Sequence, residues 1–348
     1  MNELKEQLER DETAQEITAL PHVRFAVNET PYCFWDLDVH GKNLEFINKI
    51  DPKYFQHVAN LHGELLEGDE KQYAAAALRI AYSHGLETLF AFLCAVVQAP
   101  DCVIGWFLKY QNRDLYDLVR KINEQRFIYS KIVEHRITWR VIADVIFMNF
   151  KTGDEGKDEN LRKNFARLWR RFATDFLDQK SDVEYNSIKH GFRAKMGGFS
   201  LAIGAEDIPG VPAPPERMRT MANSVFGSSF YIPERLHNSR NFGVSHQSLN
   251  WDPENLFHAL HLISMSIHNA VASLRILHGV PLNQVPFMFS DKDETYDLPW
   301  LRYSGLTSMA WNAQITEQAI KPMSKEDILA VYSEGQDEHT NVTAGDET

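Results

Sequence analysis

The stretch that decides the fold lies at residues 73–97 and reads YAAAALRIAYSHGLETLFAFLCAVV. Its only polar side chains between the first tyrosine and the last valine are Arg79, Ser83, His84, Glu87 and Thr88. A helix that is apolar on nearly every side lies in the centre of a protein rather than on its surface. The sequence therefore predicts a long buried helix from Asp69 to Gln98, which ends because Pro100 follows.

Similar patterns predict further helices after this stretch, at about 112–126, 130–149 and 158–179. A further helix begins at Asp252-Pro253, an N-cap residue followed by proline, and ends near Leu277. Residues 194–250 instead show short alternating runs and a proline-rich loop, which are typical of strands. The predicted fold is mainly α, a helical bundle with long buried helices and a small antiparallel β insertion at about 194–250.

Five regions follow from these patterns. They are an N-terminal helical arm and irregular segment at 1–66, a helical bundle core at 67–193, the β and loop insertion at 194–250, a C-terminal helix with following loops at 251–332, and a disordered acidic tail at 333–348.

The composition favours a cytoplasmic protein. Apolar residues are never continuous over eighteen positions, and the first residues are charged, so we expect neither a membrane span nor a secretory signal. The three cysteines form no Cys-x-x-Cys pair, which fits a reducing compartment. The sequence also lacks the motifs of P-loop nucleotide hydrolases, dinucleotide-binding enzymes, zinc proteases and α/β-hydrolases.

Charge is distributed unevenly along the chain. The net charge is −12, yet residues 160–195 contain nine basic and four acidic side chains. A locally basic surface on an acidic body suits a site for an anionic ligand. A solvated helix face would carry the same charges, so both interpretations stay open.

The most site-like segment is YNSIKHGFR at residues 185–193. His190 can move a proton near neutral pH, Lys189 and Arg193 can hold a phosphate, and Asn186 can orient a ligand. Together with Tyr185 these residues form the predicted catalytic group. The alternative is a helix C-terminus that carries cations because the helix dipole favours them there.

Two other groups of polar residues stand out. Arg79, His84 and Glu87 are the expected supporting or binding residues, or else members of a buried ion-pair network between helices. Three histidines occupy the last long helix, at His258, His261 and His268. No cysteine or carboxylate near them completes a zinc site, so we expect no metal, although a metal-dependent helical enzyme is a third hypothesis.

The pairing of RxxYSHGLE at residues 79–87 with YNxxKHG at 185–191 resembles the HEPN superfamily (higher eukaryotes and prokaryotes nucleotide-binding domains). The resemblance implies a helical domain that binds RNA or a nucleotide and forms a homodimer. In active members, which include toxins and phage-defence proteins, it implies a metal-independent endoribonuclease without a cofactor. By the same implication their histidine would act as a base and their arginine would bind phosphate, with four to six residues between the two.

Two segments of this chain have that spacing, Arg79 to His84 and Arg240 to His246, whereas Asn186 rather than arginine precedes His190. The expected function is therefore RNA or nucleotide binding, with ribonuclease activity as its catalytic form. The alternative is a non-catalytic regulatory or interaction protein with a protein partner, in which the polar helix residues form a structural network.

Overall fold

The computed structural model describes residues 22–132, 136–190, 193–206, 208–235, 242–301, 306–315 and 323–330. Residues 1–21 of the expected N-terminal region at 1–66 and the expected acidic tail at 333–348 lie outside these residues, as does Arg240. The chain forms two compact units. The first comprises Met1–Phe230 and Ser248–Ser308, and the second comprises Tyr231–Gln247 and Met309–Thr348.

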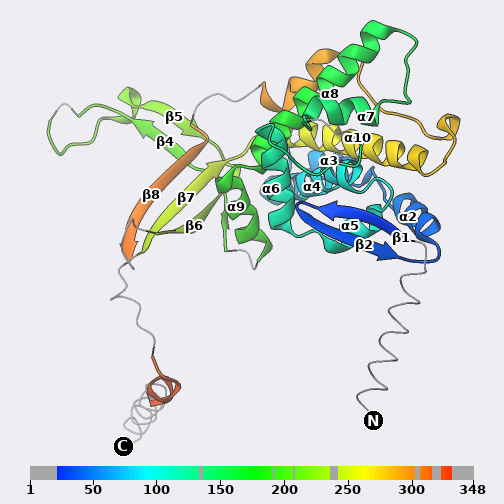
Figure 1. The fold of residues 1–348 in the computed structure, drawn as a ribbon. Helices are drawn as coiled ribbons and strands as arrows, with labels where there is room; N and C mark the ends of the chain where they lie inside the picture. Colours follow the sequence, from blue (N-terminus) through cyan, green and yellow to red (C-terminus); the bar gives the residue numbers. More distant parts are fainter. Residues whose placement is uncertain are drawn as a thin grey trace, which may run out of the picture. The chain divides into compact units, whose positions relative to one another are not determined.

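The first unit is mainly α, which confirms the predicted class (Figure 1). Its α-helices are α2 (Val39–Asn48), α3 (Tyr54–Gly63), α4 (Lys71–Gln98), α5 (Val103–Lys109), α6 (Asn112–Asn123), α7 (Trp139–Ile146), α8 (Glu155–Phe176), α9 (Gln179–Lys189) and α10 (Pro253–Leu277). Short 3-10 helices occur at η1 (Pro215–Arg217), η2 (Leu282–Gln284) and η3 (Asp293–Trp300).

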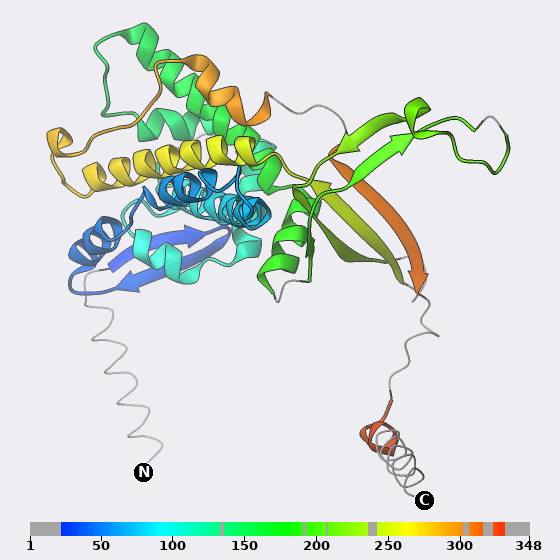
Figure 2. The ribbon, with the colours of Figure 1, turned by 180° about the vertical axis from the view of Figure 1, so that it is seen from behind.

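Helix α4 forms the centre of this unit, because nearly all of its second half is buried. Helices α3 and α10 pack along it, as Figures 1 and 2 show from opposite sides. Gly85 allows this close approach: a Cβ atom there would lie 3.1 Å from Cγ2 of Ile263 and 3.4 Å from Cδ1 of Phe55. The central helix is thus packed against its neighbours on several sides.

Helices α4 and α10 are long and apolar enough to cross a membrane by length and composition alone. In each, 67% of the most apolar window is buried inside the fold. Core helices of globular proteins have the same composition, because their apolar surface contacts other helices instead of lipid.

The predicted helix at 130–149 is wrong in its first half, since α7 begins only at Trp139. The preceding segment is bound to the end of α4 instead. The buried Gln98 side chain donates to the backbone oxygen of Tyr129 at 3.0 Å, and the backbone N–H of Lys131 donates to the oxygen of Val97 at 2.9 Å. These bonds hold the segment extended.

Helix α8 holds η3 in place through its basic face. Arg171 donates to Asp297 at 2.7 Å and lies over the Trp300 ring at 5.2 Å from its centroid. On the opposite face of α8, Phe165, Trp169 and Phe172 are fully buried. Part of the basic cluster predicted from sequence therefore positions Trp300.

The strands form small antiparallel pairs and one larger sheet. They are β1 (His22–Val27), β2 (Thr30–Trp35), β3 (Lys195–Met196), β4 (Ser200–Ile203), β5 (Arg219–Asn223), β6 (Gly227–Arg235), β7 (Phe242–Asn250) and β8 (Ser308–Ile315). β1 pairs with β2, β4 pairs with β5, and the four-stranded sheet has the order β3-β6-β7-β8. The outer parts of β6, β7 and β8 belong to the second unit.

Gly198 and Gly227 allow close contact between the backbone segments at the start of β6 and the end of β7. A Cβ atom on Gly198 would lie 2.4 Å from the backbone oxygen of Ser224, and one on Gly227 would lie 2.1 Å from that of Leu249. Asn250 closes the same corner, because its side chain bonds both the N–H and the oxygen of Phe199.

Strand β8 corrects the sequence-based description of 251–332 as a helix and loops. Its alternation, with Met309, Trp311, Ala313 and Ile315 separated by small or polar residues, is a strand pattern. The signal is weak because the run is short and contains the polar residues Asn312 and Gln314. A strand at the edge of a sheet can tolerate such residues.

Candidate ligand cavity at the start of helix α9

A buried carboxylate organises the polar residues between α4 and α9. Glu184 has no solvent exposure, and its Oε2 accepts from Nη2 of Arg79 at 2.6 Å and from Nε at 2.8 Å. Its other oxygen accepts from the indole N–H of Trp251 at 2.8 Å and from the hydroxyl of Ser228. The buried charge is thus both paired and fully hydrogen-bonded, as burial requires.

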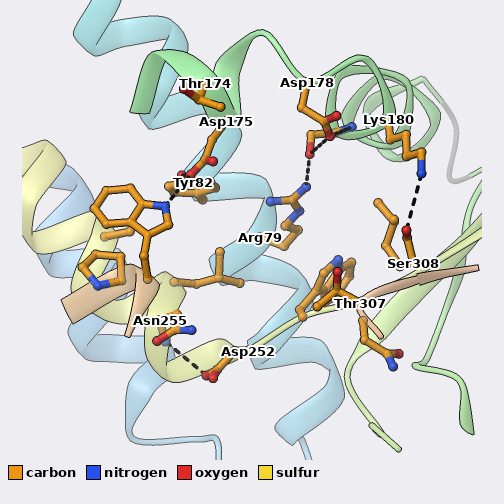
Figure 3. A pocket seen from close by; sticks show the side chains of 18 residues that line it. Arg79, Tyr82, Thr174, Asp175, Asp178, Lys180, Asp252, Asn255, Thr307 and Ser308 are labelled. Carbon is orange, nitrogen blue, oxygen red and sulfur yellow. Dashed lines mark hydrogen bonds between the residues drawn. The ribbon is translucent and has the colours of Figure 1, made fainter. Parts of the chain in front are cut away.

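Beside this network lies a cavity of about 430 Å³ (Figure 3). Residues of α4, α8, α9, α10 and η3 line it, together with the segments that precede α10 and β8. Its wall includes the aromatic side chains of Tyr82, Trp251 and Trp300 and the cationic side chains of Arg79 and Lys180. The cavity therefore combines flat apolar surfaces with a few polar groups, which is typical of small-molecule sites.

Asp175 is the acidic group of one wall. Its Oδ2 accepts from the hydroxyl of Tyr82 at 2.5 Å and from the indole N–H of Trp300 at 3.2 Å. Burial raises the pKa of this carboxyl above its ordinary value, while these two hydrogen bonds and the charge of Arg79 act in the opposite direction. A protonated Asp175 could donate a hydrogen bond, and an ionised one could only accept.

Asn255 lies on another wall of the cavity, in the first turn of α10 (Figure 3). Asp252 caps this helix by accepting from the backbone N–H groups of Glu254 and Asn255. The Asn255 side chain is only 3% exposed, and neither its amide nitrogen nor its amide oxygen has a hydrogen-bond partner within the described part of the chain. Such groups are rare in native proteins, because burial without a partner is costly.

A smaller hollow of about 30 Å³ adjoins this cavity and shares Arg79, Tyr82 and Asp175 with it. Three of the residues predicted from sequence line it, namely Arg79, Glu87 and Tyr185, and the hydroxyl of Tyr185 donates to Glu87 at 3.4 Å there. Burial, and then the neighbouring Glu87 charge, raises the pKa of Tyr185. The hollow has room for about one water molecule rather than for a ligand.

The rest of the predicted catalytic group lies at the other end of α9. Lys189, His190 and Arg193 are exposed. The Lys189 ammonium lies 5.3 Å from the centre of the Tyr185 ring, and Arg193 Nε donates to the backbone oxygen of His190 at 3.1 Å. Asn186 donates to Asp182 within the helix at 3.1 Å. The 430 Å³ cavity includes none of these side chains.

Arg79 and His84 do not share a site, although their spacing fits the motif. Arg79 faces α9, whereas His84 is exposed and makes edge-to-face contacts with Tyr54 and Phe55 of α3. Four residues beyond Arg79, Ser83 lines the small hollow instead. Five residues correspond to about 140° around a helix, which sends the two side chains to different neighbours.

The three histidines of α10 contact protein groups. Nδ1 of His261 lies 2.9 Å from the backbone oxygen of Phe257, and Nε2 of His268 lies 2.8 Å from that of Pro286. His258 lies 3.9 Å from Glu254. Among the residues that the structure describes, no three potential ligands gather as a metal ion would require.

Sequence reasoning missed the cavity residues Asp175, Lys180, Trp251, Asn255 and Trp300. They come from four separate segments, and none forms a motif with the others. One signal was present: the predicted start of a helix at Asp252-Pro253 places Asn255 in its first turn. Its missing hydrogen bonds, however, can be recognised only once the surrounding residues are in place.

Comparison of the chain with protein-family models, curated proteins and solved structures finds no match.

Proposed function

We propose that this chain binds RNA or a nucleotide in the cytoplasm, and that the cavity at the start of α9 receives a base of that ligand. The volume of about 430 Å³ lies within the range of small-molecule sites. The rings of Trp251 and Trp300 offer flat surfaces on which a base can stack. Lys180 can attract the phosphate on the ribose of the same nucleotide.

The unsatisfied amide of Asn255 is the observation that carries this proposal; because its two polar atoms are almost fully covered, the ligand reaches them only by displacing neighbouring side chains of the cavity wall. Burying this amide without partners costs on the order of 1–3 kcal/mol, and a ligand that supplies a donor and an acceptor side by side removes that cost. The edge of a nucleobase has such a pair, and asparagine recognises adenine in this way. Three acidic residues, Asp175, Asp178 and Asp252, line the same cavity, which favours amino groups of a base over a phosphate inside it.

Calorimetric titration tests the proposal with AMP, adenosine, UMP and a short single-stranded RNA. We expect binding to the wild-type chain and a loss of at least about tenfold in affinity for Asn255→Leu. Lys180→Ala should weaken AMP but leave adenosine unchanged, because only AMP carries a phosphate. If the wild-type chain binds none of these ligands, the proposal is wrong.

Cleavage of RNA is a second candidate activity, and the exposed groups at the other end of α9 favour it. His190 could act as the base, with Lys189 and Arg193 binding phosphate. Ten residues of helix separate His190 from Lys180, or about 15 Å along its axis. Incubation of RNA with the chain in EDTA tests this idea; intact RNA, or equal cleavage by His190→Ala, would exclude it.

The pairs Arg79–Glu184 and Tyr185–Glu87 favour the alternative interpretation for those four residues, namely a structural network within the fold. We therefore assign ligand contacts to Asn255 and Lys180, and we assign positioning of the helices to the ion pair. If the chain folds normally and binds no nucleotide, the alternative applies to the whole protein. The chain would then be a non-catalytic protein that interacts with another protein.

A further inference from the structure

The loop between β4 and β5, which can be followed in Figures 1 and 2, is rich in proline. Its residues 209–215 read PGVPAPP. Proline stiffens a loop by fixing φ, and exposed proline-rich segments are also bound by specialised protein domains. Two pairs have the spacing PxxP that such domains bind, Pro209 with Pro212 and Pro212 with Pro215. The conformation of the loop decides which pair a partner can use.

Two turns enclose an extended stretch at residues 211–214. Before it, the backbone N–H of Val211 donates to the oxygen of Ile208 at 3.0 Å. After it, in η1, the N–H of Arg217 donates to the oxygen of Pro214 at 2.9 Å. Pro214 itself has φ −64° and ψ 147°, the values of polyproline II. Each residue of the stretch either is a proline, whose φ is fixed, or precedes one and is held extended. The stretch therefore forms one short turn of polyproline II.

Exposure along this stretch follows a period of three. Ala213, at its centre, is only 6% exposed. Val211 and Pro212 before it are exposed, Pro214 after it is half-buried, and Pro215 is exposed again. Because polyproline II has three residues per turn, positions 211 and 214 form one row, positions 212 and 215 form a second, and position 213 lies on a third. The third row faces the protein, and the other two face outward.

Gly204, just after β4, holds the buried row in place. A Cβ atom on Gly204 would lie 2.7 Å from Cβ of Ala213 and 3.1 Å from Cγ of Met218. The missing side chain thus lets Ala213 pack directly on the backbone of the hairpin. The stretch is therefore ordered before any partner binds, and a partner avoids most of the entropy cost of ordering it.

We propose that residues 211–215 are a docking site for a protein domain with an aromatic-lined groove of the SH3 type. Such grooves bind polyproline II segments that contain PxxP, because the prolines present a preformed apolar ridge. Pro212 and Pro215 supply that ridge, with Val211 and Pro214 beside them. Ala213 is the spacer and stays against the hairpin. The inference does not depend on the proposed ligand, since none of these residues lines the cavity.

The structure also separates the two PxxP pairs. Gly210 has φ +85° and lies between Pro209 and Pro212, so the chain turns there and the first pair cannot share one polyproline II segment. Pro209 is exposed like Pro212 and Pro215. It therefore provides a matched control, a proline of the same loop and the same exposure that lies outside the docking stretch.

Binding of the full chain to an array of purified SH3 domains, followed by calorimetry with the tightest binder, tests the proposal. We expect at least one domain to bind with a dissociation constant of roughly micromolar order. Pro212→Ala and Pro215→Ala should each weaken that binding by at least about tenfold, because each removes a ring from the ridge. Pro209→Ala should leave the dissociation constant unchanged within about twofold.

Circular dichroism of each variant confirms that the fold is intact, and Pro215→Ala serves where Pro212→Ala unfolds. The proposal is overturned if no domain of the array binds the wild-type chain. It is equally overturned if Pro212→Ala and Pro215→Ala bind as tightly as the wild type. A loss in Pro209→Ala as large as in the other two would also contradict it, because the docking stretch would then not be residues 211–215.

Discussion

The two ends of α9 contain similar polar residues but differ in what surrounds them. At its start, Ser181 and Glu184 contact Arg79 beside a cavity, and every polar atom of Glu184 is bonded. At its end, Lys189 and His190 project into solvent. The end of α9 that has a recognisable sequence motif is thus exposed to solvent. The end without a motif lies beside an enclosed cavity. A motif identifies residue types, whereas a site also requires the surfaces that enclose a ligand.

The largest expected difference between the two ends is in stability. Glu184→Ala leaves the buried Arg79 guanidinium without its carboxylate, which should lower the free energy of unfolding by about 3–5 kcal/mol. Urea denaturation followed by circular dichroism measures this. Asp182→Ala is the control on the same helix, since Asp182 is exposed and its side chain accepts from Asn186 within the helix. Equal effects of the two substitutions would contradict the comparison.

The second prediction concerns pH and Asp175. Because burial raises the pKa of Asp175 in the folded state, its ionisation opposes folding. Its contribution to stability is complete below the ordinary pKa of 3.8 and is lost as pH rises through the folded-state value. Asp175→Asn should therefore gain stability relative to wild type as pH rises from strongly acidic to neutral. Denaturation midpoints of both proteins across that range measure the difference, and a difference independent of pH would disprove the assignment.

A smaller effect on stability is expected for Asn255→Leu. Removal of an unsatisfied buried amide by a side chain of similar size should be neutral or stabilising by up to about 1 kcal/mol. Thermal unfolding of the ligand-free protein measures it. A loss of several kcal/mol would show that the amide has structural hydrogen bonds, and would remove the main support for the cavity as a ligand site.

The smallest effect is expected at the exposed end of α9. His190→Ala and Lys189→Ala should each change the free energy of unfolding by less than about 0.5 kcal/mol, because both side chains are exposed. The same denaturation experiment measures this. A large loss for either variant would mean that this end of the helix is packed, and the contrast between the two ends would disappear.

The sequence allowed prediction of α4 and α10 because burial of a long helix requires a long apolar run, and capping and proline signals mark its ends. It also indicated that Arg79, His84 and Glu87 need partners, which was wrong for His84, because that side chain is exposed. It could not identify Glu184 as the centre of that network, because a glutamate in a polar helix looks like a surface residue. Strand β8 and the cavity residues were missed for a related reason: their roles arise from contacts between segments far apart in the chain.

The most direct test of the cavity as the ligand site compares AMP binding by Asn255→Leu with AMP binding by His190→Ala, both confirmed as folded. We predict that calorimetry will show affinity reduced by at least about tenfold for Asn255→Leu and unchanged for His190→Ala. The reverse result, with binding lost only in His190→Ala, would place the ligand at the exposed end of α9 and contradict the proposed cavity site.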